Sequence, residues 1–129
     1  MTPEAAIYTF LSGFGVPAYA AASVPDQDSP EWGGFPYLTY ELVIGQWNGG
    51  EVNMTVNLFD LTTRESKLNA KVREIHDAIG IGGVTLPCDG GMLWVKRGSP
   101  WAQAMTIEGE MEGVKRRYIN INLEYLTVD

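Results

Sequence analysis

Strict alternation of apolar and polar residues is the sequence feature that most constrains what this chain can fold into. In the stretch EVNMTVNLF, the apolar side chains Val52, Met54, Val56 and Leu58 recur at every second position, with polar residues between them. The stretches YLTYELVIG and RRYININLEY alternate in the same way. Because successive side chains of a strand point to opposite faces, each stretch predicts a strand with one buried face and one polar face.

Turn-forming residues separate the alternating stretches and predict hairpins. Asn48, Gly49 and Gly50 lie between the strands expected over 37–45 and 51–59, and these residue types tolerate the positive φ of tight hairpin turns. From residue 84 onward only strands and turns are expected. The strands cover 84–88, 92–97, 101–107 and 117–128, with turns at 89–91 and 108–113.

Capping residues and helical spacing predict two helices. The first begins after Thr2, which can cap it, has Pro3 in its first turn and ends before Gly13 and Gly15. The second runs over about 63–79, and its apolar residues fall within an arc of about 60°. One narrow apolar stripe favours a helix that packs one face against a sheet. The stripe consists of Leu68, Val72, Ile75 and Ile79.

The predicted elements follow the order α-β-β-α-β-β-β-β. Strand–helix–strand units do not repeat, which disfavours a doubly wound parallel sheet, and the hairpins favour antiparallel pairing. We therefore predict an α+β fold with one domain over 1–129, in which a two-layer, mostly antiparallel sheet carries both helices on one face. A long irregular loop is expected at about 23–36, where prolines and glycines interrupt any regular period.

Charge and composition exclude several functional classes. The chain has 129 residues and a formal net charge of -7, so its bulk charge should repel nucleic acid and anionic membranes. One cysteine cannot form an internal disulfide or a cysteine-based zinc site, and one histidine excludes a multi-histidine metal cluster. A basic leader and a membrane-spanning segment are not evident, so we expect synthesis in the cytoplasm.

The residues with catalytic potential have simpler structural interpretations. His76 flanks the apolar stripe of the second helix, and we interpret it as a boundary or surface histidine because no nucleophile is identified beside it. Cys88 precedes Asp89, an acidic neighbour that disfavours a reactive thiolate. The run GIGG over 80–83 follows a helix, whereas a dinucleotide-binding loop follows a strand. We therefore expect no enzyme activity, catalytic residues, cofactor or metal.

Asparagine recurs on the polar side of the predicted strands. Asn53 and Asn57 belong to one strand, and Asn120 and Asn122 belong to the last strand. Two interpretations of this face stay open. It is either a solvated sheet surface, or a polar surface that lines a wet channel or contacts a neighbouring subunit.

Aromatic and charged residues in predicted loops and turns are candidates for a subunit interface. The chain has four tryptophans, and exposed tryptophans near glycine or proline often anchor interfaces. Burial of Trp32 by its own loop is the alternative. An acidic turn could also pair with basic residues of a neighbouring subunit. The interface candidates are Trp32, Phe35, Trp47, Glu108, Glu110, Glu112, Lys96 and Arg116.

Three stretches resemble the tail terminator or minor capsid (head–tail completion) proteins of long-tailed bacteriophages and prophages. They are PYLTYEL at 36–42, GGVTLPCDGGMLWVKRGSPWAQ at 82–103 and RRYININLEYLTVD at 116–129. Proteins of that family have a similar size and open with a helix. An extended loop, a hairpin, a central helix and a run of strands follow. The stretches bear on fold rather than mechanism, and the family has no catalytic residues to carry over.

The resemblance implies a structural virion component. Terminators assemble as a ring, commonly a hexamer, that caps the tail tube and offers a surface to the head connector. The implied partners are copies of the chain, tail-tube proteins and head-connector proteins, without specific nucleic-acid binding or membrane contact. The implied location is the virion tail, after synthesis in the bacterial host cytoplasm. Another head–tail completion protein, an assembly chaperone, and a small ligand-binding domain or enzyme stay open as alternatives.

Overall fold

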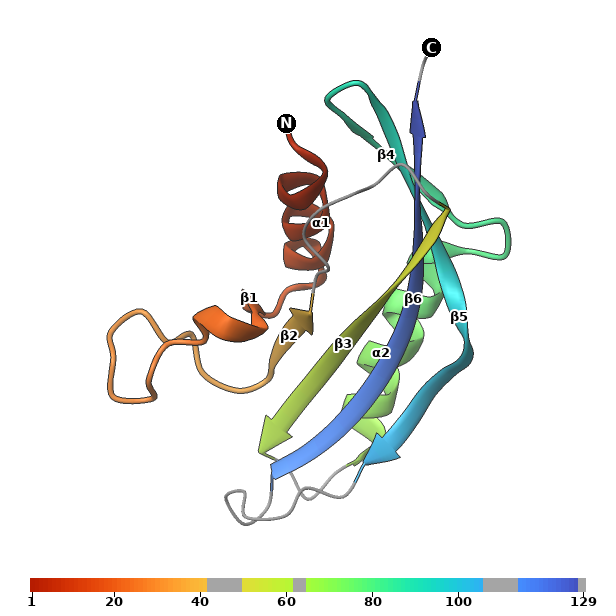
Figure 1. Cartoon of the computed structure of the whole chain (residues 1–129). Helices are drawn as coiled ribbons and strands as arrows, with labels where there is room; N and C mark the ends of the chain where they lie inside the picture. Colours follow the sequence, from red (N-terminus) through yellow and green to blue (C-terminus); the bar gives the residue numbers. More distant parts are fainter. Residues whose placement is uncertain (42–49, 62–64, 106–113, 128–129) are drawn as a thin grey trace.

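The computed structural model describes residues 1–41, 50–61, 65–105 and 114–127, and Figure 1 shows their arrangement. Within these ranges the chain forms two α-helices, two short 3₁₀ helices and six strands. The α-helices are α1 (Pro3–Leu11) and α2 (Glu65–Ile79), and the 3₁₀ helices cover Ser12–Phe14 and Ala21–Ser23. The strands are β1 (Ala18–Ala20), β2 (Tyr37–Glu41), β3 (Glu51–Leu61), β4 (Val84–Cys88), β5 (Gly91–Met105) and β6 (Val114–Thr127).

The six strands form one sheet with the order β1-β2-β3-β6-β5-β4. β1 pairs with β2 in parallel, and the other neighbouring strands pair in antiparallel fashion. Figure 1 shows the long strands β3, β6 and β5 curving side by side, with α2 behind them in that view. The predicted α+β class is confirmed, and the sheet is mixed and curled.

Local residues define α1 as the sequence predicts. The Thr2 side chain accepts a hydrogen bond from the Ala5 backbone N–H at 3.1 Å, and Pro3 occupies the first turn. A 3₁₀ turn follows Leu11, and Gly15 then adopts a positive φ of 77°. Because glycine reaches this conformation without steric cost, it ends the helical segment.

Two strands differ from the prediction. The predicted order has no strand ahead of the long loop, but Ala18–Ala20 forms β1. Three residues are too few to show an alternating pattern, so the sequence does not reveal this strand. The strands expected at 92–97 and 101–107 are one strand, β5, with an irregularity between Arg97 and Ala102. This β-bulge keeps both halves paired with β6, so the predicted break is wrong.

Both helices pack apolar residues into one hydrophobic cluster against the sheet. Ile7 and Leu11 of α1 are buried there, and so is the predicted stripe of α2. The alternating apolar residues of β3 and β6 meet them from the sheet. Burial of this cluster is the main source of stability. Its central members are Met54, Val56, Leu58, Leu68, Val72, Ile75, Ile79, Ile119, Ile121 and Leu123.

Several predicted boundaries can be compared with the structure. The 23–36 segment contains neither a strand nor an α-helix, and its first residue ends the 3₁₀ helix Ala21–Ser23. α2 ends at Ile79, and Gly80 follows with a φ of 78°. The remaining predictions lie outside the described residues. They concern the end of the 37–45 strand, its turn at 48–49, Trp47, the beginning of the second helix and the acidic turn at 108–113.

Candidate functional site

The sheet face opposite the hydrophobic cluster, which we call the outer face, carries the polar residues that alternate with the core. Its centre is formed by β3 and β6, whose register places Asn53 opposite Asn122 and Thr55 opposite Asn120. β2 and β5 lie on either side of this centre. The outer-face residues are Tyr37, Thr39, Glu41, Glu51, Asn53, Thr55, Asn57, Phe59, Trp94, Lys96, Arg116, Tyr118, Asn120, Asn122 and Glu124.

The four predicted asparagines all lie on the outer face and are fixed by hydrogen bonds. Asn53 Nδ2 donates to Asn122 Oδ1 at 3.1 Å. Asn120 Nδ2 donates to the Pro100 carbonyl oxygen at 2.8 Å, across the bulge of β5. Asn57 is buried and accepts a hydrogen bond from an arginine. The alternation therefore placed these side chains on one surface, and their role in lining a channel stays a prediction.

An aromatic cluster extends one end of the outer face. The rings of Trp32 and Phe35 meet edge to face with centroids 5.2 Å apart, and both contact Tyr37. The Tyr37 ring stacks on Phe59 with centroids 5.0 Å apart. Trp32 and Phe35, two of the interface candidates, are thus half-buried and attached to the sheet through β2 and β3. We call Trp32, Phe35, Tyr37 and Phe59 the aromatic cluster.

Arg116 connects the aromatic cluster to the polar part of the outer face. Its Nε donates to Asn57 Oδ1 at 2.8 Å, and its guanidinium lies 5.9 Å from the Phe59 centroid and 6.0 Å from the Tyr118 centroid. The Tyr118 hydroxyl in turn shares a 3.0 Å hydrogen bond with the Thr55 hydroxyl. Cation–π attraction and a charge-assisted hydrogen bond therefore hold this guanidinium against the sheet.

Lys96 also has partners in its own chain. Its ammonium forms an ion pair with Glu51 and lies 4.3 Å from the centroid of the Trp94 ring. Both basic interface candidates, Lys96 and Arg116, are thus engaged in intramolecular contacts. Trp47 and the three glutamates of the acidic turn lie outside the described residues, so their part in an interface stays a prediction.

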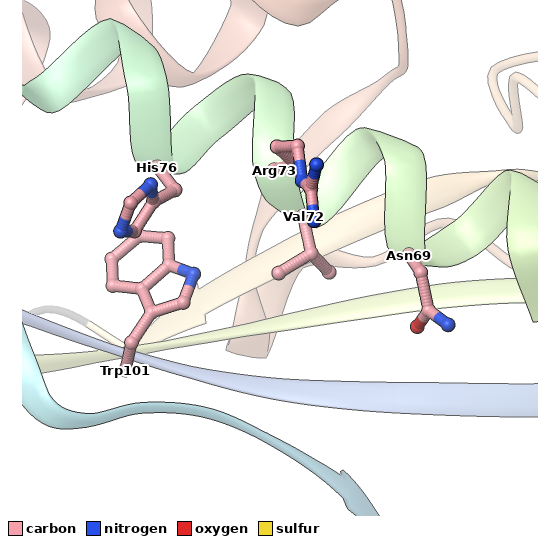
Figure 2. Close-up of a pocket in the computed structure, with 5 residues that line it drawn as sticks. All are labelled: Asn69, Val72, Arg73, His76 and Trp101. Atoms are coloured by element: carbon pink, nitrogen blue, oxygen red, sulfur yellow. The ribbon is translucent and has the colours of Figure 1, made fainter.

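A groove lies between α2 and the second half of β5, and we call it the α2–β5 groove (Figure 2). Its first part encloses about 290 Å³ and its second part about 320 Å³. The first part is lined by Asn69, Val72, Arg73, His76 and Trp101. The second part shares Asn69 and Val72 and adds Ala102, Gln103, Ala104 and Arg117.

The α2–β5 groove is not predicted from the sequence. Asn69, Arg73 and His76 are spaced by four and three residues, which places them on one side of a helix. This spacing is a signal that could have indicated a polar helix surface beside Val72. It does not indicate that Trp101, on a strand remote in sequence, lies across from them. The groove depends on how α2 packs on the sheet.

His76 and Cys88, the two residues with catalytic potential, lie on α2 and at the end of β4. The His76 side chain is 36% exposed, its ring meets Trp101 edge to face at 5.4 Å, and its Nδ1 lies 3.1 Å from Asp77 Oδ1. Burial, and secondarily the charge of Asp89, raises the pKa of the Cys88 thiol above its ordinary value. A raised pKa lowers the thiolate fraction and the reactivity of a cysteine.

Comparison of the chain with protein-family models, curated proteins and solved structures gives no match. Among the residues that the structure describes, no group of three or more His, Cys, Asp or Glu side chains is arranged to hold a metal ion. No described helix combines the length and the apolar character needed to cross a membrane. The outer face and the α2–β5 groove are therefore the basis on which a function can be proposed.

Proposed function

We propose that this chain is a structural component of a bacteriophage or prophage virion, a tail terminator that forms a ring on the end of the tail tube. The ring, a hexamer according to the resemblance, stops the tube and joins it to the head connector. Its location is the virion tail, after synthesis in the host cytoplasm. The chain is a two-layer domain that acts by fitting surfaces together and performs no catalysis.

The outer face is the observation that best supports this proposal. Its amides and hydroxyls are fixed by mutual hydrogen bonds, such as Asn53 with Asn122 and Thr55 with Tyr118. A preorganised polar surface loses little conformational entropy when a second rigid surface docks on it. The adjoining aromatic cluster presents Trp32, and tryptophan is enriched among the residues that contribute most to binding at interfaces.

The charge distribution supports passage of DNA without tight binding. Protein–DNA affinity depends mainly on lysine and arginine contacts with phosphate. The chain carries a net charge of -7, and the four asparagines of the outer face are uncharged. On that face the Lys96 ammonium is paired with Glu51, and the Arg116 guanidinium, held by the neutral Asn57 amide, keeps its charge. Three glutamates, Glu41, Glu51 and Glu124, outnumber these two cations there. A channel lined by such a surface would let DNA slide.

Trp32→Ala is expected to weaken ring formation and to leave the fold intact. Trp32 is half-buried and its ring contacts Phe35 and Tyr37, so its loss should destabilise the monomer by about 1–3 kcal/mol, which a domain of ordinary stability tolerates. The same substitution removes a large apolar contact from a docking neighbour. Sedimentation velocity and electron microscopy of the purified chain measure the fraction in rings. Trp47→Ala is expected to act in the same direction.

Tyr8→Ala provides the matched control for these variants. Tyr8 lies on α1 rather than on the outer face, and it is 51% exposed. Its removal should leave assembly unchanged. If both tryptophan variants assembled normally, neither tryptophan would belong to the interface. A chain that stays monomeric at every concentration would overturn the ring itself.

Purified phage particles separate a terminator from an assembly chaperone, because a chaperone leaves its client before the particle is complete. Mass spectrometry of finished particles should detect this chain in a small, fixed amount per tail. A chain that is present in infected cells but missing from finished particles would favour the chaperone instead.

A further inference from the structure

Two arginines beside the α2–β5 groove have no acidic partner among the described residues. Arg73 is exposed, lines the groove and forms no ion pair with any of them. Arg97 of β5 donates a hydrogen bond from Nε to the His76 carbonyl oxygen at 3.0 Å. The acidic side chains of α2 contact other residues. Their contacts are Glu65 with Arg117, Glu74 with Lys71, and Asp77 with His76. Within the described ranges, the groove therefore has a local excess of positive charge.

The α2–β5 groove also lies along a strand edge that is open within the described part of the chain. β4 pairs with β5 only from Gly91 to Val95, so beyond Val95 the described neighbour of β5 is β6. Ala102 and Ala104 line the groove along this edge, and their small side chains leave room beside the backbone. A docking segment can therefore approach both Arg73 and the edge of β5.

A projecting loop over residues 24–31, which we call the acidic loop, carries the opposite charge. The Ser29 N–H donates to the Asp26 carbonyl oxygen at 2.9 Å, and the Trp32 N–H donates to the Ser29 carbonyl oxygen at 3.2 Å. Turns ordered in this way lose little conformational entropy when the loop docks. The loop carboxylates are exposed and form no ion pair with any described residue. They belong to Asp26, Asp28 and Glu31.

The acidic loop and the α2–β5 groove lie at different ends of the sheet. The loop precedes β2 and follows β1, whereas the groove lies at β5, and β3 and β6 separate β2 from β5. In Figure 1 the loop extends to the left, away from the strands, while α2 and β5 lie to the right. The two surfaces do not meet within one copy, so their opposite charges are complementary between copies.

We propose that the α2–β5 groove of one copy binds the acidic loop of a second copy. Carboxylates of the loop accept charge-assisted hydrogen bonds from Arg73, and the turn of the loop packs between Val72 and the edge of β5. The inference rests on the proposed self-association and names the contact that produces it. Because two different surfaces meet, the contact is heterologous, and it closes into a ring when it is repeated by a suitable rotation.

Arg73→Glu tests the groove side of the contact in the full chain. The position is exposed, so the fold should persist, while repulsion of the loop carboxylates should weaken self-association about tenfold. Sedimentation velocity over a range of concentrations measures this loss. Lys67→Glu is the matched control, because it changes the charge equally at an exposed position of α2 outside the groove lining. An equal loss in both variants would contradict the site.

The double variant Asp26→Lys with Asp28→Lys tests the loop side. It makes an acidic chain less negative, so a change in bulk charge alone would reduce repulsion between copies and favour association. The proposed contact has the opposite consequence, because the new ammonium groups face Arg73 of the neighbour. Self-association should fall about tenfold. Unchanged or stronger association would overturn the proposal.

An equimolar mixture of the Arg73→Glu chain and the double loop variant provides the sharpest test. The acidic loop of the first chain fits the unchanged groove of the second, and the lysines of the second fit the glutamate of the first. The mixture should therefore recover most of the association that each variant lacks alone. A misfolded variant could not be rescued in this way, and a mixture no better than its components would contradict the pairing of loop with groove.

The same measurements distinguish a failure of this inference from a failure of the proposed function. If the unaltered chain forms rings and Trp32→Ala weakens them, but the charge reversals in the groove and in the acidic loop leave them unchanged, this inference is wrong and the ring stands. An unaltered chain that is monomeric at every concentration contradicts both.

Discussion

Gly98→Ala is expected to lower the free energy of unfolding by about 2–3 kcal/mol, because the bulge of β5 has no room for a side chain. A Cβ atom at position 98 would lie 2.6 Å from the Asn120 Cβ and 2.7 Å from the Asn120 carbonyl oxygen. Asn120 belongs to β6, which is paired with β3 on one side and β5 on the other. It cannot move away without disturbing both ladders, and its amide also holds the Pro100 carbonyl oxygen.

Chemical denaturation measures this loss, and Gly82→Ala serves as the control. Gly82 lies in the turn before β4, where an added Cβ would have no atom within 4 Å. An alanine there fits the native backbone and should change the free energy of unfolding by less than about 1 kcal/mol. If the two alanine variants were equally stable, the bulge would not contain the close contact that the structure shows.

The centre of the sheet could be predicted because its strands alternate along most of their length. In β3, Met54 and Val56 are buried in the hydrophobic cluster, while Asn53 and Thr55 occupy the outer face. The apolar stripe of α2 could be predicted for the same reason, because the spacing of its residues places them on one side of the helix. These patterns are local: the geometry of a single strand or helix decides which side each residue takes.

β1 and the continuous β5 could not be predicted, because both depend on partners remote in sequence. β1 has three residues, and its pairing with β2 brings together segments on either side of the long loop. Gly98 and Pro100 are residue types that usually interrupt strands. Here they lie within β5, and the amide of Asn120, 20 residues further on, binds the Pro100 carbonyl. A long-range contact thus overrides local preference.

The candidate site also combines features that local sequence patterns predict with features that depend on long-range contacts. Alternation places Asn57 on the outer face, but its hydrogen bond with Arg116, 59 residues away, depends on the register of β3 with β6. The high number of tryptophans makes Trp32 an interface candidate, but its contact with Tyr37 depends on how the loop that contains Trp32 packs against β2. The meeting of His76 with Trp101 depends on the packing of α2, and no local pattern indicates it.

Under the proposed function, the positions of the two surfaces explain how one small domain can serve a ring. The outer face lies on one side of the sheet, and the α2–β5 groove lies beside the helix on the other. The two surfaces therefore lie on opposite sides of the sheet, and a molecule bound to one would leave the other accessible. Because α2 forms one wall of the groove, the packing of α2 on the sheet also determines the shape of the groove.

Ile75→Ala is expected to lower the free energy of unfolding by about 3–4 kcal/mol, because Ile75 is fully buried in the middle of the α2 stripe. The substitution removes most of the side chain and leaves a cavity that a paired sheet cannot readily close. A domain of this kind has a total stability of about 5–15 kcal/mol, so the melting temperature should fall by about 10 °C or more. Thermal unfolding followed by circular dichroism measures the change. Lys67→Ala, at an exposed position of the same helix, should change the stability by less than about 0.5 kcal/mol. Equal stability of the two variants would contradict the packing of α2 through this stripe, and with it the groove that this packing forms.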